Sequence, residues 1–377
     1  MTTHLKSKNG SWNLNNKKNK NLFFKNLVLT VFEDKSGNTF VIKDKKKKKI
    51  KTKITSFIEA QLKKGFYACG YFSYEYNQRT KKKPKYRAMF NIYKDVTTTS
   101  SKELLEFKEN LSLKKTTTDL ELISGVKRAK QYIQDGDIYQ INLTREFIFT
   151  GLSKPYLAFL NYYKTQPVEY GAFFDFQDHF IISGSMELFI KKQGNKVVSK
   201  PIKGTAPANS KEDRNLKNNQ KEIAENLMIV DLMRNDLSQI CKPGTVKTKK
   251  LFQKKSYSTL VQLESEVSGT IKTDIKIDRI FTSLMPPGSV TGTPKSRAKN
   301  IIEEIENHSR GPYCGALGYF SPSGDFCFSV GIRVAVVEKE LSKFYTGAGI
   351  VWDSKPIKEN AETILKTKAF SESIRVK

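Results

Sequence analysis

The sequence has few of the side chains that build disulfide frameworks and histidine-based metal centres. Its 377 residues include four cysteines and three histidines, and no two cysteines form a C-x-x-C pair. Scattered, unpaired thiols are typical of reducing compartments, so we expect a cytoplasmic protein with free cysteines. The same spacing argues against a zinc site.

Long apolar runs are also absent. No stretch of 18 apolar residues occurs, and the first 20 residues lack the apolar segment of a secretory signal. We therefore expect no membrane span and no signal peptide, and we expect the polar residues 1–20 to be frayed or disordered. With 38% hydrophobic residues, the chain still has enough apolar surface for a large core.

Arginine is scarce in a chain that is otherwise strongly basic. The net charge is +28, but only 11 of the 66 basic residues are arginines. Base readout and bidentate phosphate contacts favour arginine over lysine, so the charge is weak support for a nucleic-acid partner. The longest basic run, Lys45–Lys49, is expected in a turn or loop between short strands. A basic nucleic-acid-binding protein remains a remote alternative.

The apolar patterns predict an α+β fold, because long strands that suit antiparallel pairing alternate with helices. A continuous strand is expected over 325–339. Helices are expected over 119–135, 154–164, 211–240, 275–284 and 295–307, and from about Pro356 onward.

Two of these helices carry the same pair of carboxylates. Glu222 and Glu225 are three residues apart, as are Glu359 and Glu362, so each pair lies on one helix face. Two solvated faces would explain them. Oxygen-only ligands without histidine or cysteine would alternatively suit Mg²⁺, which keeps several waters and uses few carboxylates.

Two glycine-containing stretches and one arginine suggest that an anion binds. The loop Gly288–Arg297 runs into a helix and offers backbone N–H groups, although an ordinary helix cap would look the same. In Gly347–Asp353 two glycines flank Ala348, which allows close approach of a ligand or a plain strand bulge. Arg333 lies among apolar residues, and a buried arginine needs an anion.

Several motifs occur together in a recognisable order. They are PIKGT, ENLMIVDLMRNDL, PPGSVTGTPKSRA, RGPYCGALGYF, GIRVAVV and GAGIVWDSKPIKENAET, with GYFSYE and GDIYQINLT before them. From roughly residue 65 to 370 the chain resembles the chorismate-utilising enzymes, which include anthranilate synthase, isochorismate synthase and aminodeoxychorismate synthase component I. The resemblance implies two packed, largely antiparallel sheets flanked by helices, in four layers (α/β/β/α) around a deep central cleft.

The resemblance also implies a set of ligands for a metal ion and for the substrate. Glu225 and Glu362 would be the closest Mg²⁺ ligands, and Glu222 and Glu359 would hold its waters. The metal would bind the ring carboxylate of chorismate. The second carboxylate and the rest of the cavity would be lined by Gly204, Thr205, Ser289, Tyr313, Arg333, Gly347, Ala348 and Gly349.

Lys203 in PIKGT indicates the branch within this family. Aminodeoxychorismate synthases resemble this chain there, whereas anthranilate synthases usually carry alanine, and Asn226 follows the same branch. By this resemblance Lys203 would be the nucleophile and Glu187 the general acid, giving 4-amino-4-deoxychorismate for 4-aminobenzoate and folate synthesis. Gln262 stands where the family has a histidine, which disfavours the alternative, anthranilate synthase component I. Ala206 and Ala208 replace arginines that are usual in this loop.

The expected partners follow from what the chain does not encode. No Cys–His pair suits glutamine hydrolysis, so ammonia is expected from a glutamine amidotransferase subunit or from solution. The pyruvate-releasing step to 4-aminobenzoate is expected in a separate enzyme. The expected organisation is a frayed segment over 1–20, an N-terminal part of the sheet core over 21–115 and a chorismate-binding catalytic domain over 116–377.

Overall fold

A computed structural model gives the fold of residues 11–15, 20–99, 109, 111–257, 260–339 and 341–374. The expectation of a frayed N-terminus concerns residues that mostly lie outside this described part. Within it, Ser11–Asn15 forms strand β1 and pairs with both β2 and β9.

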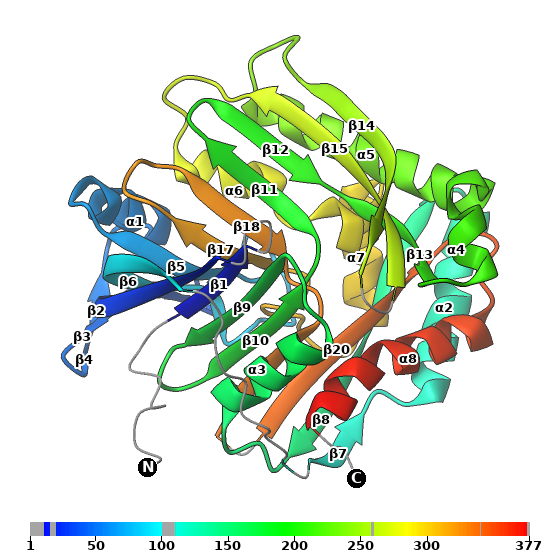
Figure 1. The fold of residues 1–377 in the computed structure, drawn as a ribbon, viewed down its shortest axis with the longest axis horizontal. Helices are drawn as coiled ribbons and strands as arrows, with labels where there is room; N and C mark the ends of the chain where they lie inside the picture. Colours follow the sequence, from blue (N-terminus) through cyan, green and yellow to red (C-terminus); the bar gives the residue numbers. More distant parts are fainter. Residues whose placement is uncertain are drawn as a thin grey trace.

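The strands form two large antiparallel sheets, as expected (Figure 1). The first sheet runs in the order β4-β3-β2-β6-β5-β17-β18-β11-β12-β15-β14, and β13 continues beside β15. The second runs β9-β10-β19-β20-β8, with β7 and β16 both paired to β8; β1 connects the two sheets. The remaining strand bounds are β2 (Lys20–Asp34), β3 (Thr39–Lys43), β4 (Lys46–Ile50), β5 (Tyr67–Phe72), β6 (Tyr86–Thr99), β7 (Ser112–Thr116), β8 (Gln140–Thr150), β9 (Tyr170–Asp175), β10 (Phe180–Ser185), β11 (Leu188–Gln193), β12 (Lys196–Lys200), β13 (Ile202–Pro207), β14 (Lys247–Ser256), β15 (Leu260–Thr270), β16 (Gly292–Thr293), β17 (Ala316–Phe320), β18 (Phe326–Val330), β19 (Val334–Glu338) and β20 (Leu341–Ile350).

Helices cover the outer faces of both sheets. Helix α5 packs on β13 and β15, and α1 packs on β5, whereas α2 and α8 pack on β8 and β20 of the second sheet (Figure 1). No described helix is long and apolar enough to span a membrane. The helix bounds are α1 (Ile54–Lys63), α2 (Asp119–Gln134), α3 (Pro155–Thr165), α4 (Lys211–Asn215), α5 (Gln220–Ile240), α6 (Ile277–Leu284), α7 (Lys295–Ile305) and α8 (Pro356–Ile374).

The main core lies between these layers and draws on both sheets. The rings of Phe72 and Phe281 stack with centroids 4.4 Å apart, and Phe328 meets Phe281 edge-on at 4.9 Å. Phe174 and Ile181 of the second sheet belong to the same fully buried cluster. Burial of aromatic side chains on this scale supplies much of the hydrophobic stabilisation of the fold.

The expected continuous strand over 325–339 is wrong. The chain leaves β18 at Val330, bends through Gly331–Arg333 and enters β19 at Val334. Strand β18 pairs within the first sheet and β19 within the second, so this bend carries the chain between sheets. Arg333 adopts φ 54°, which is uncommon for a residue other than glycine. The prediction failed because an apolar run has the same sequence pattern whether it stays in one sheet or crosses to another.

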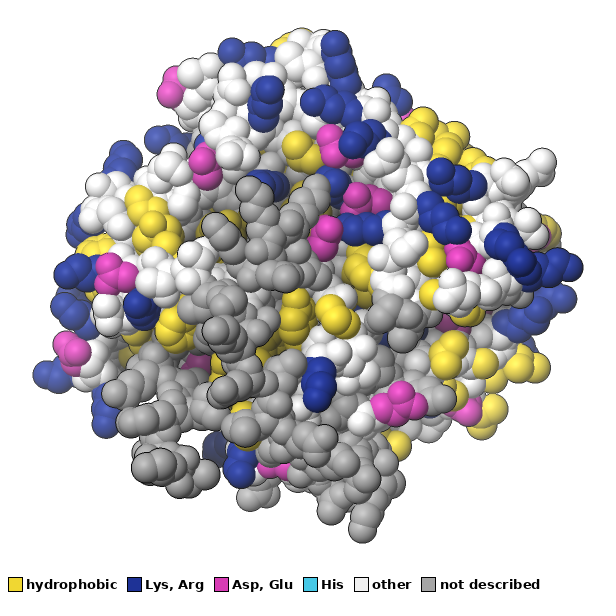
Figure 2. Space-filling model, viewed as in Figure 1, with side chains coloured by type: hydrophobic (Ala, Val, Ile, Leu, Met, Phe, Trp, Pro, Cys, Tyr) yellow, Lys and Arg dark blue, Asp and Glu magenta, His cyan; other side chains and the backbone are white. Residues whose placement is uncertain are grey.

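The expected turn or loop over the lysine run is confirmed only for Lys45, and the rest of the run is a strand. Residues 46–50 form β4, and the turn before it is made by Asp44 and Lys45, which both have positive φ. Lys47 lies over the ring of Phe40, 4.3 Å from its centroid. The basic side chains of this hairpin face solvent, and Figure 2 shows lysines and arginines scattered over the upper, left and right parts of the visible face. That scatter gives no support to the remote nucleic-acid alternative.

Two helix expectations also change. The helix expected over 211–240 is interrupted, because α4 ends at Asn215 and α5 begins at Gln220, where the Asn219 side chain accepts from two backbone N–H groups. Helix α1 was not expected. It packs against β5 of the first sheet and against α6.

Candidate functional site

The candidate site lies where the chain crosses between the two sheets. One crossing joins β10 to β11 and contains Glu187, and the other joins β18 to β19 and contains Arg333. The two crossings are hydrogen-bonded to each other and to the strand ends: Val330 N–H donates to the Glu187 carbonyl, and Gly184 N–H donates to the Arg333 carbonyl, both at 3.0 Å. A buried carboxylate and a cationic side chain are therefore held at the junction of the sheets.

Lys203 reaches this junction from β13. The strand register shifts between Lys203 and Thr205, and Gly204 between them has φ +83°, which glycine adopts without strain. The Lys203 ammonium lies 3.4 Å from the point where a Cβ on Gly349 would stand. The bulge thus aims a lysine of the first sheet at a glycine of the second, and a Cβ at position 349 would already be in van der Waals contact with the amine.

The backbone of Lys203 is held by helix α5. The Asn226 side-chain amide donates to the Lys203 carbonyl at 3.3 Å and to the Leu263 carbonyl at 3.0 Å, and its oxygen accepts from the Ser265 hydroxyl at 2.6 Å. Asn226 is fully buried. It stands at the start of the buried stripe of α5, and it fixes the helix to β13 and β15.

Glu187 is a buried carboxyl with an elevated proton affinity. Burial raises its pKa to about 7, against the opposing effects of a hydrogen bond from Ser289, the nearby charge of Lys203 and the Ile202 N–H group. Ser289 is itself buried in the loop before α7. The structure therefore joins three expected site residues, and it gives the carboxyl the mixed protonation at neutral pH that a general acid needs.

The two glycines of β20 approach side chains closely, as their spacing suggested. A Cβ on Gly347 would stand 3.0 Å from the Tyr313 hydroxyl. Tyr313 is buried and stacks on Tyr345, with centroids 5.3 Å apart. Gly347, Ala348 and Gly349 pair with residues 144, 143 and 142 of β8, so the GDIYQINLT and GAGIVW motifs are adjacent strands.

Arg333 is tied to α8 through a lysine that the sequence did not single out. Its guanidinium donates to the Lys366 carbonyl at 2.8 Å. The Lys366 ammonium donates to the Gly347 carbonyl at 2.7 Å and pairs with Glu362 at 2.6 Å. Burial lowers the pKa of Lys366, against the opposing effect of Glu362. Lys366 therefore links one proposed metal ligand to the proposed substrate-binding strand.

Glu222 of α5 lies near Glu225 on its own helix and near Glu362 of α8, and Glu362 lies near Glu359. Burial first, and then the charges of Glu225 and Glu362, raise the pKa of Glu222. Burial and Glu362 likewise raise the pKa of Glu359. The carboxylate of Glu222 also lies beside Gly204, 3.0 Å from its Cβ position, so helix α5 and the PIKGT bulge are in contact. Carboxylates that repel one another are a site of high affinity for a cation.

In the structure, two lysines supply positive charge next to these glutamates. Lys221 lies 3.9 Å from Glu225, and Lys366 pairs with Glu362, each four residues away on the same helix. In the described residues, no three histidine, cysteine or acidic side chains stand close enough together to coordinate a metal ion. The donor chemistry fits Mg²⁺, because all four groups on the two helices are carboxylates, and the ion would replace the two lysines as counter-charge.

Thr205 lies at the edge of this arrangement. Its side chain is exposed, and its hydroxyl accepts from the Gln262 amide at 3.2 Å. Gln262, on β15, thus borders the PIKGT bulge. A different side chain at position 262 would change the hydrogen bond to Thr205.

Sequence reasoning missed a buried ion-pair network next to the site. Arg310, which is 1% exposed, pairs with Glu306 at 2.7 Å and donates to the carbonyls of Val290 and Asn142. Glu75 accepts from the Arg310 backbone N–H at 2.6 Å. The sequence did contain a signal for this network, because each of the motifs GYFSYE, GDIYQINLT, PPGSV and RGPYCG contributes one of its residues.

Comparison with known proteins places the chain in a family. The profile of the family described as chorismate binding enzyme matches residues 93–372. Anthranilate synthase component 1 of Saccharolobus solfataricus is 39% identical over 260 residues, which cover 67% of this chain and 61% of that protein. The chloroplastic aminodeoxychorismate synthase of Arabidopsis thaliana is 37% identical over 266 residues, covering 67% of this chain and 29% of that protein. The chain thus spans less than two thirds of these relatives.

Solved structures share the fold at lower identity. Anthranilate synthase component I of Streptococcus pneumoniae superposes with a TM-score of 0.81 at 23% identity, covering 93% of this chain and 91% of that one. The menaquinone-specific isochorismate synthase of Escherichia coli gives 0.71 at 16% identity, covering 92% and 88%. These likenesses establish the architecture of two sheets and flanking helices.

Proposed function

This chain belongs to the chorismate binding enzyme family, and from that premise we propose that it is an aminodeoxychorismate synthase, which converts chorismate and ammonia to 4-amino-4-deoxychorismate. One observation carries the proposal. A lysine, Lys203, is aimed into the junction of the sheets beside the buried carboxyl Glu187. A covalent amine-transfer reaction needs an amine as nucleophile and a neighbouring group that can accept and return a proton.

The proposed site holds a dianionic substrate from two sides. Arg333, Tyr313 and the backbone of Gly347 and Gly349 would bind the enolpyruvyl carboxylate, with Ser289, Ala348, Gly204 and Thr205 lining the same space. Glu225 and Glu362, backed by Glu222 and Glu359, would hold Mg²⁺, which when bound supplies positive charge for the ring carboxylate. Charge-assisted contacts at both ends would orient the ring toward Lys203.

The proposed reaction has two displacements. Lys203 first passes a proton to Glu187, which leaves a neutral amine and a carboxylic acid. The amine attacks ring carbon 2, both double bonds of the ring diene shift by one position toward carbon 4, and the carbon-4 hydroxyl leaves as water with the proton of Glu187. Ammonia then attacks carbon 4, both double bonds shift back, and the Lys203 amine is expelled. The elevated pKa of Glu187, about 7, suits this exchange at neutral pH.

Anthranilate synthesis is the second candidate, because several relatives are anthranilate synthase component 1 proteins, including one at 39% identity. That reaction aminates carbon 2 and releases pyruvate. Lys203 argues against it, since an amine already directed at carbon 2 would compete with ammonia there.

The test is product formation from chorismate, Mg²⁺ and ammonium by the wild type and by Lys203→Ala. We expect 4-amino-4-deoxychorismate, detected as 4-aminobenzoate after addition of a lyase, and a fall of on the order of 10³-fold or more in the variant, as is typical when a nucleophile is lost. Lys200→Ala is the matched control. Lys200 pairs with Glu264 at 3.1 Å on the neighbouring strand and should retain activity. Fluorescent anthranilate without a lyase, or full activity in Lys203→Ala, would refute the proposal.

A further inference from the structure

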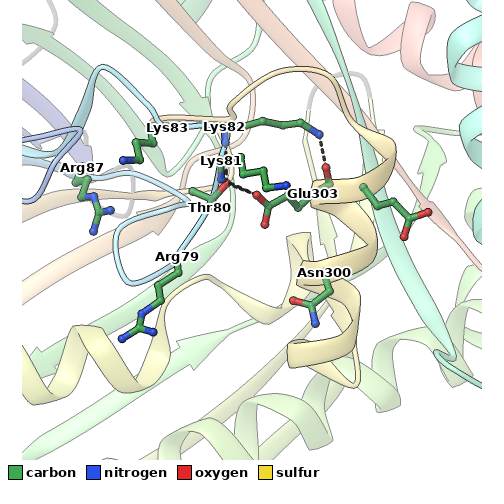
Figure 3. Close-up of a pocket in the computed structure, with 9 residues that line it drawn as sticks. Arg79, Thr80, Lys81, Lys82, Lys83, Arg87, Asn300 and Glu303 are labelled. Atoms are coloured by element: carbon green, nitrogen blue, oxygen red, sulfur yellow. Dashed lines mark hydrogen bonds between the residues drawn. The ribbon is translucent and has the colours of Figure 1, made fainter.

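A basic cavity lies away from the candidate site, between the connection from β5 to β6 and helix α7. Its volume is about 750 Å³. Five of the residues that line it are cationic, and all five come from a single short segment: Arg79, Lys81, Lys82, Lys83 and Arg87. The opposite wall is the solvent-facing side of α7 (Figure 3).

The two carboxylates of this cavity are already engaged. Glu303 accepts from the Lys81 backbone N–H at 2.6 Å and from the Thr80 hydroxyl at 3.0 Å, and Figure 3 shows it pointing at that backbone. Glu304 pairs with Arg128 and accepts from the Tyr132 hydroxyl at 2.8 Å. These contacts order the loop against α7. Glu304 is paired with Arg128, so among the described residues Glu303 is the one carboxylate of the cavity lining that has no cationic partner, against five cationic side chains.

Most of the cations lack an acidic partner. The Lys82 ammonium donates to the carbonyls of Glu303 and Glu306 at the end of α7, which are neutral acceptors. Across the described residues, Arg79, Lys81, Lys83 and Arg87 take part in no ion pair within 4.0 Å.

Arg87 gives an independent indication of a ligand. Its Nε atom is buried and has no hydrogen-bond partner, which is costly for a guanidinium donor. Glu33 lies close enough to interact with the charge of Arg87, but burial raises the pKa of Glu33 to about 7, so this carboxyl carries only part of a negative charge at neutral pH. The side-chain ends of Lys83 and Arg87 lie on the same side of the loop in Figure 3.

We propose that this cavity is a binding site for a small polyanion that carries two or more phosphate or carboxylate groups. Unpaired like charges in one concave site repel one another, and a multivalent anion removes that repulsion. Arginine forks bind oxyanions with directed hydrogen bonds, and the lysines add mobile charge. The volume is within the range of small-molecule sites. The proposal does not depend on the reaction at Lys203.

The basic hairpin of β3 and β4 provides a matched comparison. Lys46 and Lys48 are as exposed as Arg79 and Lys83, but they stand along a strand and line no part of the basic cavity. Removing two charges at either place changes the net charge equally. A difference between the two double variants therefore reports the cavity and not the charge of the whole molecule.

The test is isothermal titration of the full chain with inorganic tripolyphosphate and, separately, with citrate, in 0.15 M salt, where long-range charge effects are screened within about 8 Å. We expect saturable binding with one site per chain for at least one of the two anions. Arg79→Gln/Lys83→Gln should weaken that binding by at least tenfold, and Lys46→Gln/Lys48→Gln by less than twofold. The anion that binds more tightly identifies phosphate or carboxylate as the ligand chemistry.

Three outcomes would overturn the proposal. One is the absence of saturable binding for both anions. Another is an equal loss in the two double variants, which would indicate non-specific attraction to a basic protein. The third is displacement of the anion by chorismate in proportion to chorismate affinity, which would place the anion at Arg333 instead. Circular dichroism of each variant confirms that these exposed substitutions leave the fold intact.

Discussion

At the scale of single residues, the chemistry depends on Lys203 and Glu187 acting as a pair. Each has a different environment. Lys203 is partly exposed on a bulged strand, and Glu187 is buried at a crossing between sheets. Burial favours the neutral carboxyl of Glu187, and the nearby charge of Lys203 favours the ionised one; burial is the larger effect, so the pKa of Glu187 is raised.

The first prediction concerns the stability of the protein as a function of pH. The pKa of Glu187 is raised from 4.5 to about 7 in the folded protein. The folded state therefore binds this proton more tightly, so the stabilisation is complete below pH 4.5 and is lost as the pH rises through about 7. Between pH 5 and pH 8, wild type should lose roughly 2–3 kcal/mol of unfolding free energy relative to Glu187→Gln.

Urea unfolding of both proteins at the two pH values measures this difference. Because the Glu187→Gln variant has no titratable group at this position, only the change in the gap between the two proteins is relevant. A gap that stays constant with pH, or one that changes in the opposite direction, would contradict the burial of an ionisable Glu187 with a raised pKa.

At the scale of elements, helix α5 has two roles on two faces. Its inner face packs on β13 and β15 through apolar residues and Asn226, and its Glu222 and Glu225 face α8. The same helix thus holds the peptide of Lys203 and presents half of the proposed metal ligands. If α5 packed less closely on the sheet, the positions of the Lys203 backbone and of the two glutamates would be less well defined.

The second prediction is that Asn226→Ala destabilises the protein by about 2–4 kcal/mol, because three buried hydrogen-bonding groups lose their partner. The groups are the carbonyls of Lys203 and Leu263 and the hydroxyl of Ser265. Chemical denaturation measures the effect. Leu227→Ala, which alters a half-exposed neighbour on the same helix, is the control and should cost far less. Equal losses in the two variants would show that Asn226 is not a specific anchor.

The third prediction concerns the two glutamate helices. Mg²⁺ at a hundredfold excess over its dissociation constant should stabilise the wild type by about 2.7 kcal/mol, through preferential binding to the folded state. Glu225→Gln/Glu362→Gln should abolish the shift. Asp231→Asn, on the solvent face of α5, should retain it. Thermal unfolding with and without the ion measures this without any substrate, and an unchanged shift in the double variant would remove these residues as ligands.

At the scale of the whole molecule, the four cysteines are buried within the packed sheets and helices. Burial raises the pKa of Cys241 and Cys327 to about 11 and that of Cys314 to about 12. Thiols of this kind are inert, because the thiolate is the reactive form. The folded chain therefore lacks an activated cysteine for releasing ammonia from glutamine, consistent with a proposed amidotransferase partner.

The fourth prediction follows. The isolated chain should aminate chorismate with ammonium salts, and it should show no turnover with glutamine until an amidotransferase is added. The rate with ammonium should rise with pH from 7 to 9, as the fraction of free ammonia rises. Glutamine-dependent activity that persists in the purified chain and resists thiol alkylation would contradict this assignment.

The sequence by itself determined the family, the type of fold and the chemical inventory, because these depend on local motifs and their order along the chain. PIKGT, the two E-x-x-E helices and the glycines of β20 were all recognisable without coordinates. Local periodicity could not reveal that one apolar run changes sheets at Arg333, that β4 is a strand of lysines, or that Lys366 joins Arg333 to Glu362. Contacts between residues tens to hundreds of positions apart decide those features, so only the tertiary structure assembles Glu187, Lys203 and Arg333 at one junction and gathers unpaired cations over α7.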